Sequence, residues 1–268
     1  MSKSNLAVKE ELENVAAEDV IIINQNEQEN YRPSKDKEIR VNNNLSYLIM
    51  KKIVDIIAGI LGTILLVPLI AVVWFIRICL HENDGPLFFE QIRIGKNGKQ
   101  FRMYKFRTMV MEADEKLYRY LEENPEAKKE YKKYKKLKHD PRITKLGNIL
   151  RKTSLDEFPQ FVNILKGEMS LVGPRPYLYR EKEDLGEYYY NSITKVKPGI
   201  TGYWQVNGRN DVDFEERAYM DTYYIERRGI VMDLKIILKN SIGSLWLNLQ
   251  NLYNRWNGLS TIETESND

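Results

Sequence analysis

Cysteine and histidine are almost absent from this chain, which has one cysteine and two histidines among its 268 residues. Because Cys79 is the only cysteine, no disulfide can form within the chain, and a reducing compartment is the simpler setting. With His81 and His139 as the only histidines, the chain lacks the usual ligands of a zinc site. The sequence also contains neither a P-loop nor the dinucleotide-binding glycine pattern, which argues against both of these nucleotide-binding motifs.

A strong excess of either charge is also missing. Residues 1–44 carry six basic and nine acidic side chains, so they contribute −3 to the net charge of +3, and the rest of the chain contributes +6. That modest excess suits anionic substrates or a phospholipid surface, although an ordinary solvated surface has the same balance. The apolar content of 43% is ordinary for a folded protein, and the length allows one or two domains with a core.

Composition changes abruptly at Leu45. Residues 1–44 are rich in Glu, Asn, Gln and Lys and have no sustained apolar period, which predicts a disordered polar tail. Residues 53–76 contain a single charge, Asp55, over a length that fits a membrane helix. We therefore predict a membrane helix over residues 45–82, a cytosolic domain over 83–258 and a disordered tail over 259–268.

Basic residues flank the apolar segment on both sides, with Lys51 and Lys52 before it. The basic side chains after it are Arg77, Arg93, Lys96, Lys99 and Arg102. Both ends therefore satisfy the positive-inside preference for the cytoplasm. Pro68 would interrupt the helix at about Val67, and a broken helix can enter and leave the same leaflet as a re-entrant hairpin. The alternative is a kinked helix that spans the membrane.

The alternating residues on either side of Asn97-Gly98 predict a small β-hairpin. Lys105 and Arg107 lie two residues apart on its second strand, so they point to the same face. Two cations on one face fit a phosphate clamp, and they equally fit a polar outer face.

Residues 112–139 form a charged insert in which 16 of 28 side chains are Asp, Glu, Lys or Arg. The acidic half comes first, and Pro125 interrupts the insert. The lysines of the second half lack the aromatic or groove-reading pattern of a nucleic-acid site. We therefore expect a solvated helical face near a membrane and no nucleic-acid partner.

Two adjacent carboxylates, Asp156 and Glu157, mark the most informative stretch. In one register Ser154 caps a helix and Glu157 reaches back to complete a capping box. In the other, Asp156 is the cap and Pro159 falls among the first helical residues, where its missing N–H costs little. Either register places Asp156 at the positive end of a helix, where a phosphate is also favoured.

Two loops and one helix carry further candidates. Arg175 stands between two prolines that restrict its backbone, which suits either a phosphate-gripping arginine or a stiff connecting loop. Residues 197–210 combine three glycines with amides, an indole and an arginine, as ligand loops do. Apolar residues at helical spacing from Val231 to Trp256 predict an amphipathic helix, which packs either on a membrane interface or on the core.

The motifs, taken in order, resemble one known family. A proline-broken apolar segment is followed by YKFRTM, DPRIT, SLDE, NILKGEMSLVGPRP, KPGITGYWQVNGR and MDTYYIERRGIVMDLKIILKN, which together cover about residues 45–245. This set resembles the bacterial sugar transferases, and specifically the monotopic polyprenyl-phosphate phosphoglycosyl transferases. The resemblance implies an α+β, mainly helical fold with a re-entrant helix, in the bacterial inner membrane. It places the catalytic domain on the cytoplasmic side.

The same resemblance implies a two-step transfer of a sugar 1-phosphate from a UDP-sugar to polyprenyl (undecaprenyl) phosphate, with release of UMP. Asp156 would be the nucleophile and Glu157 the Mg²⁺ ligand, roles that suit carboxylates. Lys105 and Arg175 would neutralise the transferred phosphoryl group. Asp233 aligns with another aspartate that the family requires.

Substrate contacts are expected from a further set of polar residues, namely Arg107, Arg151, Gln205, Asn207 and Arg209. The lipid-linked product would start an exopolysaccharide, capsule, O-antigen or glycoprotein glycan, and homo-oligomerisation is left open. In some relatives a serine precedes the helix-breaking proline, whereas Val67 stands here, which weakens the hairpin prediction. The competing functions are a membrane-anchored basic scaffold and a glycosyltransferase that releases UDP. The sequence does not indicate which sugar is transferred.

Overall fold

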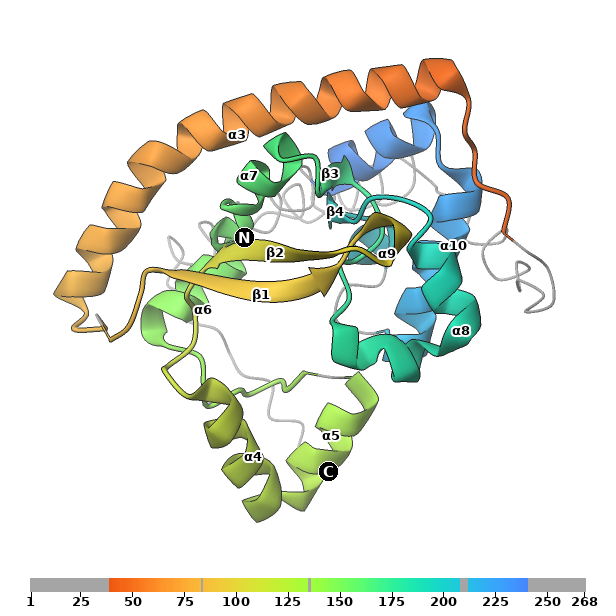
Figure 1. Ribbon diagram of the computed structural model, residues 1–268. Helices are drawn as coiled ribbons and strands as arrows, with labels where there is room; N and C mark the ends of the chain where they lie inside the picture. The colour runs from red at the N-terminus through yellow and green to blue at the C-terminus, as the bar shows by residue number, and fades with distance from the viewer. Residues whose placement is uncertain (1–38, 83, 135, 208–211, 241–268) are drawn as a thin grey trace, which may run out of the picture. The chain divides into compact units, whose positions relative to one another are not determined.

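The computed structural model describes residues 39–82, 84–134, 136–207 and 212–240. Within these ranges the protein is mainly helical and contains two small two-stranded sheets, in agreement with the predicted class (Figure 1). Most of the predicted tail over residues 1–44 lies outside the described residues, as do the tail over 259–268 and Arg209.

The apolar segment forms a single helix, α3, over Leu45–Cys79, and the side chain of Asn44 caps it by accepting the N–H of Ser46 at 3.0 Å. Pro68 lies inside this helix without ending it, so the predicted interruption at Val67 is wrong. The helix curves instead (Figure 1). A proline removes one helical hydrogen bond and crowds the preceding turn, and a bend accommodates both effects.

One face of α3 packs on the domain, and the opposite face is exposed and apolar. Gly59 and Gly62 permit close approach to α7 (Gln160–Leu165), because a Cβ at Gly62 would lie 2.2 Å from the Phe161 ring. The exposed face includes Ile53, Ile57, Leu61, Ile64, Leu65 and Phe75. By length and composition α3 qualifies to cross a membrane.

The predicted β-hairpin is confirmed as β1 (Phe88–Ile94) and β2 (Gln100–Phe106). The two strands are antiparallel, with a register from Phe88 opposite Phe106 to Ile94 opposite Gln100. The 3₁₀ turn η1 (Lys96–Gly98) joins them, and in it Asn97 and Gly98 have φ values of 59° and 72°. Asn and Gly are the residues that adopt this left-handed region most readily, so the Asn-Gly pair explains the turn.

The charged insert forms two helices, α4 (Ala113–Glu123) and α5 (Pro125–Tyr134), which confirms a helical and mostly solvated segment. Leu117 is the buried residue of α4, and none of the residues from Pro125 to Tyr134 is buried. Pro125 separates the two helices because it is tolerated at a first helical position but not in a helix interior. The next helix, α6 (Lys145–Lys152), leads to the carboxylate pair.

The chain after α6 forms short elements. They are η2 (Leu155–Glu157), α7, β3 (Ser170–Val172), η3 (Tyr179–Glu181), α8 (Lys182–Ile193), β4 (Gly199–Thr201), α9 (Tyr203–Asn207) and α10 (Phe214–Arg227). The parallel pairing of β3 with β4 is a feature that the sequence reading missed. It depends on glycine, because a Cβ on Gly199 would lie 2.1 Å from the backbone nitrogen of Gly173.

Two apolar clusters hold the hairpin between α3 and the rest of the domain. In the first, Leu66 and Val73 of α3 pack with Phe106 of β2 and with Leu146 and Leu150 of α6. The second joins Phe101 and Met103 of β2 to Ile164 and Met169. The end of β2, with Lys105, is thereby held beside η2.

Residues 230–240 are helical, and several of their apolar side chains are exposed. Asp233 and Ile236 are buried, whereas Val231, Leu234 and Leu238 are 67%, 51% and 51% exposed. Over this stretch the predicted apolar face therefore does not pack on the core, which favours the membrane-interface alternative. The continuation of that helix to Trp256 lies outside the described residues.

Candidate active site

The carboxylate pair lies in a turn that precedes a helix. Ser154 adopts a left-handed conformation with φ 57°, and its side chain caps none of the described backbone N–H groups. Asp156 and Glu157 belong to the 3₁₀ turn η2, and α7 begins only at Gln160, directly after Pro159. Both predicted capping registers are therefore wrong. The fixed φ of Pro159 suits the start of α7, so the two carboxylates stay ahead of the helix.

Lys105 of strand β2 contacts the carboxylates of the turn η2. Its Nζ lies 2.6 Å from Oε1 of Glu157 and 3.9 Å from Oδ2 of Asp156. The side chain of Asp156 is 10% exposed and that of Glu157 is 29% exposed, so both carboxylates are partly buried but still accessible to solvent. The structure thus brings Lys105 together with both carboxylates, and all three are predicted site residues.

Burial raises the pKa of Asp156 above its ordinary value of 3.8. The nearby charge of Lys105 opposes this effect, the neighbouring Glu157 adds to it, and Arg151 opposes it. The carboxylate of Asp156 is therefore destabilised by desolvation while cations keep its ionised form accessible.

The pKa of Glu157 shifts in the opposite direction. Burial alone would raise this pKa, but the ion pair with Lys105 outweighs burial, and Arg175 and Arg93 contribute further, so the net pKa is lowered. The two neighbours in the chain thus have different environments. Glu157 is held ionised, and Asp156 is the less stabilised anion.

Two predicted arginines lie near this pair. Arg151 donates from Nε to Oγ1 of Thr108 at 2.9 Å, and its charge acts on Asp156. The charge of Arg175 lowers the pKa of Glu157, and the guanidinium of Arg175 lies 5.6 Å from the Trp204 ring. The buried Nε of Arg175 has no hydrogen-bond partner among the described residues. A buried donor without a partner is a candidate for an anionic ligand.

The other predicted substrate-binding residues have local partners. Arg107 donates to the carbonyl of Pro86 at 2.8 Å and lies over the Phe89 ring. Gln205 donates to the carbonyl of Ile200 at 3.0 Å. Asn207 donates to the carbonyl of Tyr203 and accepts from Nζ of Lys239. These contacts hold the ends of the hairpin and of α9, and Arg209 lies outside the described residues.

Sequence reasoning missed Arg93 and Asp221 as site residues. Arg93 is 8% exposed and donates from Nη1 to the carbonyl of Pro176 at 2.9 Å. Burial, with help from the charge of Arg175, lowers the pKa of Arg93 to about 9. Asp221 is fully buried in α10 and accepts the backbone N–H of Arg175 at 3.1 Å. Asp221 lies in the motif MDTYYIERRGIVMDLKIILKN, which was the available signal, but it was not singled out there.

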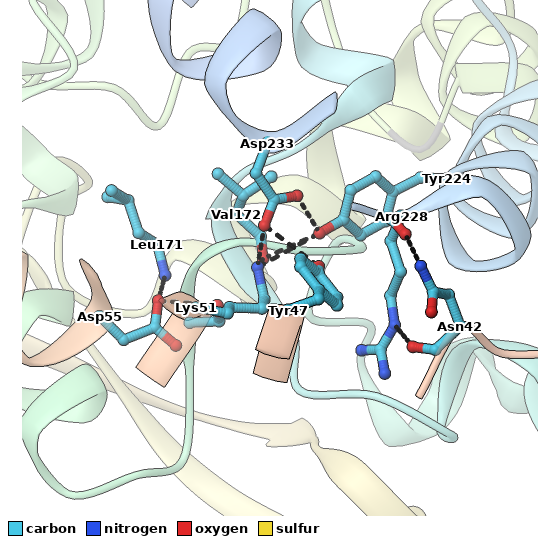
Figure 2. A network of polar contacts seen from close by, with 10 residues as sticks. Asn42, Tyr47, Lys51, Asp55, Leu171, Val172, Tyr224, Arg228 and Asp233 are labelled. Atoms are coloured by element: carbon cyan, nitrogen blue, oxygen red, sulfur yellow. Dashed lines mark hydrogen bonds and ion pairs between the residues drawn. The ribbon is translucent and has the colours of Figure 1, made fainter. Parts of the chain in front are cut away.

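Asp233 lies in a second polar cluster, at the junction with α3 (Figure 2). Its Oδ2 accepts from Nζ of Lys51 at 2.7 Å and from the hydroxyl of Tyr47 at 3.1 Å, while its Oδ1 accepts from the hydroxyl of Tyr224 at 2.7 Å. Lys51 also donates to the carbonyl of Val172 at 2.8 Å. Asp233 thus joins α3 to α10, and Lys51 extends the cluster to the end of β3.

The donor set near η2 can be compared with the needs of Mg²⁺. Among the described residues, no group of three or more His, Cys, Asp and Glu side chains is placed to hold a metal ion. Mg²⁺, however, is commonly bound by one or two carboxylates together with substrate phosphates. Glu157 is ionised and borders the site, so it fits the part of a carboxylate ligand that acts together with a bound diphosphate.

A family model described as bacterial sugar transferase matches residues 46–246. The undecaprenyl-phosphate galactose phosphotransferase of Salmonella typhimurium is 43% identical over 209 residues, which are 76% of this chain and 42% of that protein. The UDP-glucose:undecaprenyl-phosphate glucose-1-phosphate transferase of Klebsiella pneumoniae is 39% identical over 198 residues, or 71% of this chain and 39% of that protein.

A third relative is closer to this chain in length. The exopolysaccharide production protein ExoY of Sinorhizobium fredii is 41% identical over 194 residues, which are 71% of this chain and 83% of that protein. The chain therefore spans less than half of the Salmonella and Klebsiella proteins and most of the Sinorhizobium one. Because the family model covers residues 46–246, including both polar clusters, this chain belongs to the bacterial sugar transferase family.

Proposed function

We propose that this protein transfers a sugar 1-phosphate from a UDP-sugar to polyprenyl phosphate and so makes the first lipid-linked intermediate of a polysaccharide. The observation that carries the proposal is the buried carboxylate of Asp156, which Lys105 approaches to 3.9 Å, beside the ionised Glu157. The printed names of the Salmonella and Klebsiella relatives describe the same kind of transfer to undecaprenyl phosphate.

In the first step Asp156 acts as a nucleophile. A carboxylate oxygen forms a bond to the β-phosphorus of the UDP-sugar, and the bond from that phosphorus to the bridging oxygen breaks. The electron pair leaves with UMP, and the sugar phosphate stays on Asp156 as an acyl phosphate. The step needs the ionised carboxylate, whose reactivity its burial increases.

In the second step polyprenyl phosphate takes the group from the enzyme. One of its phosphate oxygens bonds to the same phosphorus, and the bond to the carboxylate oxygen of Asp156 breaks. The products are a polyprenyl-diphosphate sugar and the original carboxylate. The exposed apolar face of α3 is suited to contact the membrane that holds this acceptor.

Cations fixed around the carboxylates would stabilise the charge of the transferred phosphoryl group. Lys105, Arg151 and Arg175 are already oriented by their contacts with Glu157, Thr108 and Trp204. Fixed charges cost no reorganisation as the reaction proceeds. Glu157 would hold Mg²⁺, which when bound supplies further neutralisation of the phosphate oxygens.

The packing of α3 supports a re-entrant arrangement on the cytoplasmic side of the bacterial inner membrane. Near its start, Tyr47 and Lys51 bond to Asp233 of the domain. Near its end, Arg77 donates to the carbonyls of Glu82 and Gly85, and Glu82 accepts the backbone N–H groups of Lys145 and Leu146. Both ends contact the same domain, as the basic flanks also indicate.

Cysteine labelling in cells tests this topology. With Cys79 replaced by serine, we expect Met50→Cys and Lys96→Cys to react only with reagent that has entered the cytoplasm. Labelling of either position by an impermeant reagent from the periplasm would make α3 a spanning helix.

The activity is tested by incubating the detergent-solubilised protein with Mg²⁺, undecaprenyl phosphate and a panel of UDP-sugars. We expect UMP with at least one donor. Release of UDP would instead identify an ordinary glycosyltransferase, and no nucleotide release with any donor would favour a membrane-anchored scaffold.

The covalent intermediate is tested by mass spectrometry after incubation with the donor alone. We expect a sugar-phosphate adduct on the peptide that contains Asp156, and no adduct in Asp156→Asn. Ser154→Gly is a matched control, because it changes a neighbouring residue of left-handed φ while both carboxylates remain. An intact adduct in Asp156→Asn would remove this residue from its role.

A further inference from the structure

The loop that presents Arg175 is fixed on several sides by backbone contacts. Gly173 donates its N–H to the carbonyl of Thr201, and Pro174 accepts from the N–H of Gly199, both at 2.9 Å. From the hairpin, Arg93 donates to the carbonyl of Pro176 at 2.9 Å. The N–H of Arg175 itself bonds to a side chain, the carboxyl of Asp221. The position of Arg175 therefore depends on a group that can gain or lose a proton.

Asp221 makes only part of the hydrogen bonds that a buried carboxyl can make. Its Oδ2 accepts the N–H of Arg175 at 3.1 Å and the hydroxyl of Tyr177 at 3.0 Å. Its Oδ1 is buried and has no hydrogen-bond partner among the described residues, and the same is true of Nε of Arg175. A buried acceptor and a buried donor without partners thus belong to two residues that already share a hydrogen bond.

Few charges face this carboxyl. The charges of Arg175, in the loop, and of Arg217, in the same helix α10, both lower the pKa of Asp221. Tyr177 lies beside Asp221, and the charge of Glu181 in η3 raises the pKa of Tyr177. The guanidinium groups of Arg175 and Arg217 each lie 5.6 Å from the Trp204 ring. Burial is the largest influence, and it raises the pKa of Asp221 to about 7 against the hydrogen bonds and cations that lower it.

We propose that Asp221 is a positioning residue for Arg175, and that its protonation decides whether the guanidinium is held by Asp221 or is left to grip the diphosphate of the donor. This inference rests on the proposed function. When Asp221 is neutral, the charge of Arg175 is directed toward Glu157 and an incoming phosphate. When Asp221 is ionised, its Oδ1 becomes a charged acceptor that competes for the guanidinium.

The expected kinetic signature is a pH-dependent KM for the UDP-sugar. In the wild type we expect this KM to rise about tenfold between about pH 6 and about pH 8, because the competing carboxylate then becomes ionised. Asp221→Asn keeps the shape and a hydrogen-bond acceptor without titrating, so its KM should stay at the low-pH value throughout. A merely structural role would lower stability or kcat and leave the pH profile of KM unchanged.

Tyr177→Phe provides a second variant. The hydrogen bond from Tyr177 lowers the pKa of Asp221, so removing it should move the rise in KM to higher pH. A KM that is flat with pH in the wild type overturns the proposal. So does a rise that persists in Asp221→Asn, or one that does not move in Tyr177→Phe.

Fluorescence separates this inference from the proposed function. In a protein whose Trp74, Trp246 and Trp256 are changed to Phe, Trp204 reports on the guanidinium groups of Arg175 and Arg217, which both lie 5.6 Å from its ring. We expect its emission to titrate with a midpoint near pH 7 and the Asp221→Asn variant of the same protein to show no such transition. If no UDP-sugar yields UMP while this transition is present, the proposed function fails and the coupling stands. If UMP is released and the emission is independent of pH, the coupling fails.

Discussion

The Nζ of Lys51 lies 2.7 Å from Oδ2 of Asp233, and this ion pair joins α3 to the rest of the domain. Both side chains are largely buried, at 14% and 12% exposure. Asp233 was expected to be catalytic, yet its described partners are Lys51, Tyr47 and Tyr224 rather than the residues around Asp156. Its position indicates that it holds α3 on the domain, and Figure 2 shows how the contacts converge on it.

Removing one partner of this pair should be costly. We expect Asp233→Asn to lower the thermal stability of the detergent-solubilised protein by the equivalent of about 3 kcal/mol or more, because Lys51 stays buried without its counter-charge. The double variant Lys51→Met with Asp233→Asn should recover part of the loss. Lys52→Met is the matched control, since Lys52 is exposed on the same helix. A loss in the double variant equal to the sum of the two single losses would contradict the pairing.

Formation of the covalent adduct should lose rate at acid pH, with a midpoint above the ordinary aspartate pKa of 3.8. The nucleophile is the ionised form of Asp156, and burial raises the pKa of that group, so the rate falls as pH drops through the raised value. Lys105 opposes this rise, so in Lys105→Met the midpoint should move to still higher pH. The measurement is the normalised single-turnover rate against pH.

The control for that experiment is Arg102→Met, because Arg102 is 69% exposed and pairs with Glu90 on the outside of the hairpin. Its midpoint should match that of the wild type. A midpoint that stays in place or moves to lower pH in Lys105→Met would show that the lysine does not stabilise the carboxylate of Asp156.

Glu157→Gln should weaken the dependence on metal. If Glu157 holds Mg²⁺, the concentration needed for half-maximal UMP release should rise about tenfold or more, equivalent to about 1.4 kcal/mol of binding energy. Glu90→Gln removes a carboxylate from the outer side of the hairpin and should leave the titration unchanged. Identical titrations for the wild type and Glu157→Gln would leave Glu157 as the partner of Lys105 alone.

Gly62→Ala should loosen α3 from α7. The added Cβ would lie 2.2 Å from the Phe161 ring, so the two helices must separate or the ring must move, at a cost of about 1–3 kcal/mol. Combining it with Phe161→Leu, which makes room, should restore part of the loss in melting temperature. Additive losses in the combined variant would mean that the two residues do not limit the helix contact.

Several features were accessible from local patterns because their causes are local. The Asn97-Gly98 turn, the break at Pro125 and the apolar length of α3 each follow from what a few adjacent residues permit. The candidate site was identified from its motifs, and the structure places Lys105 beside Asp156 and Glu157. The continuation of α3 through Pro68 was not accessible, because the packing of α3 on the domain decides whether a proline ends a helix or bends it.

The sequence by itself determined the apolar helix, the hairpin and the family, because length, alternation and ordered motifs are properties of the chain. Tertiary structure alone decided how the carboxylates differ. Asp156 and Glu157 are adjacent and chemically alike, yet burial raises the pKa of one while Lys105, Arg175 and Arg93 lower the pKa of the other. These cations come from the two strands of the hairpin and from a loop, and desolvation depends on everything that packs around the turn. Asp221 was missed for the same reason, because its contact with Arg175 joins residues that are 46 positions apart in the chain.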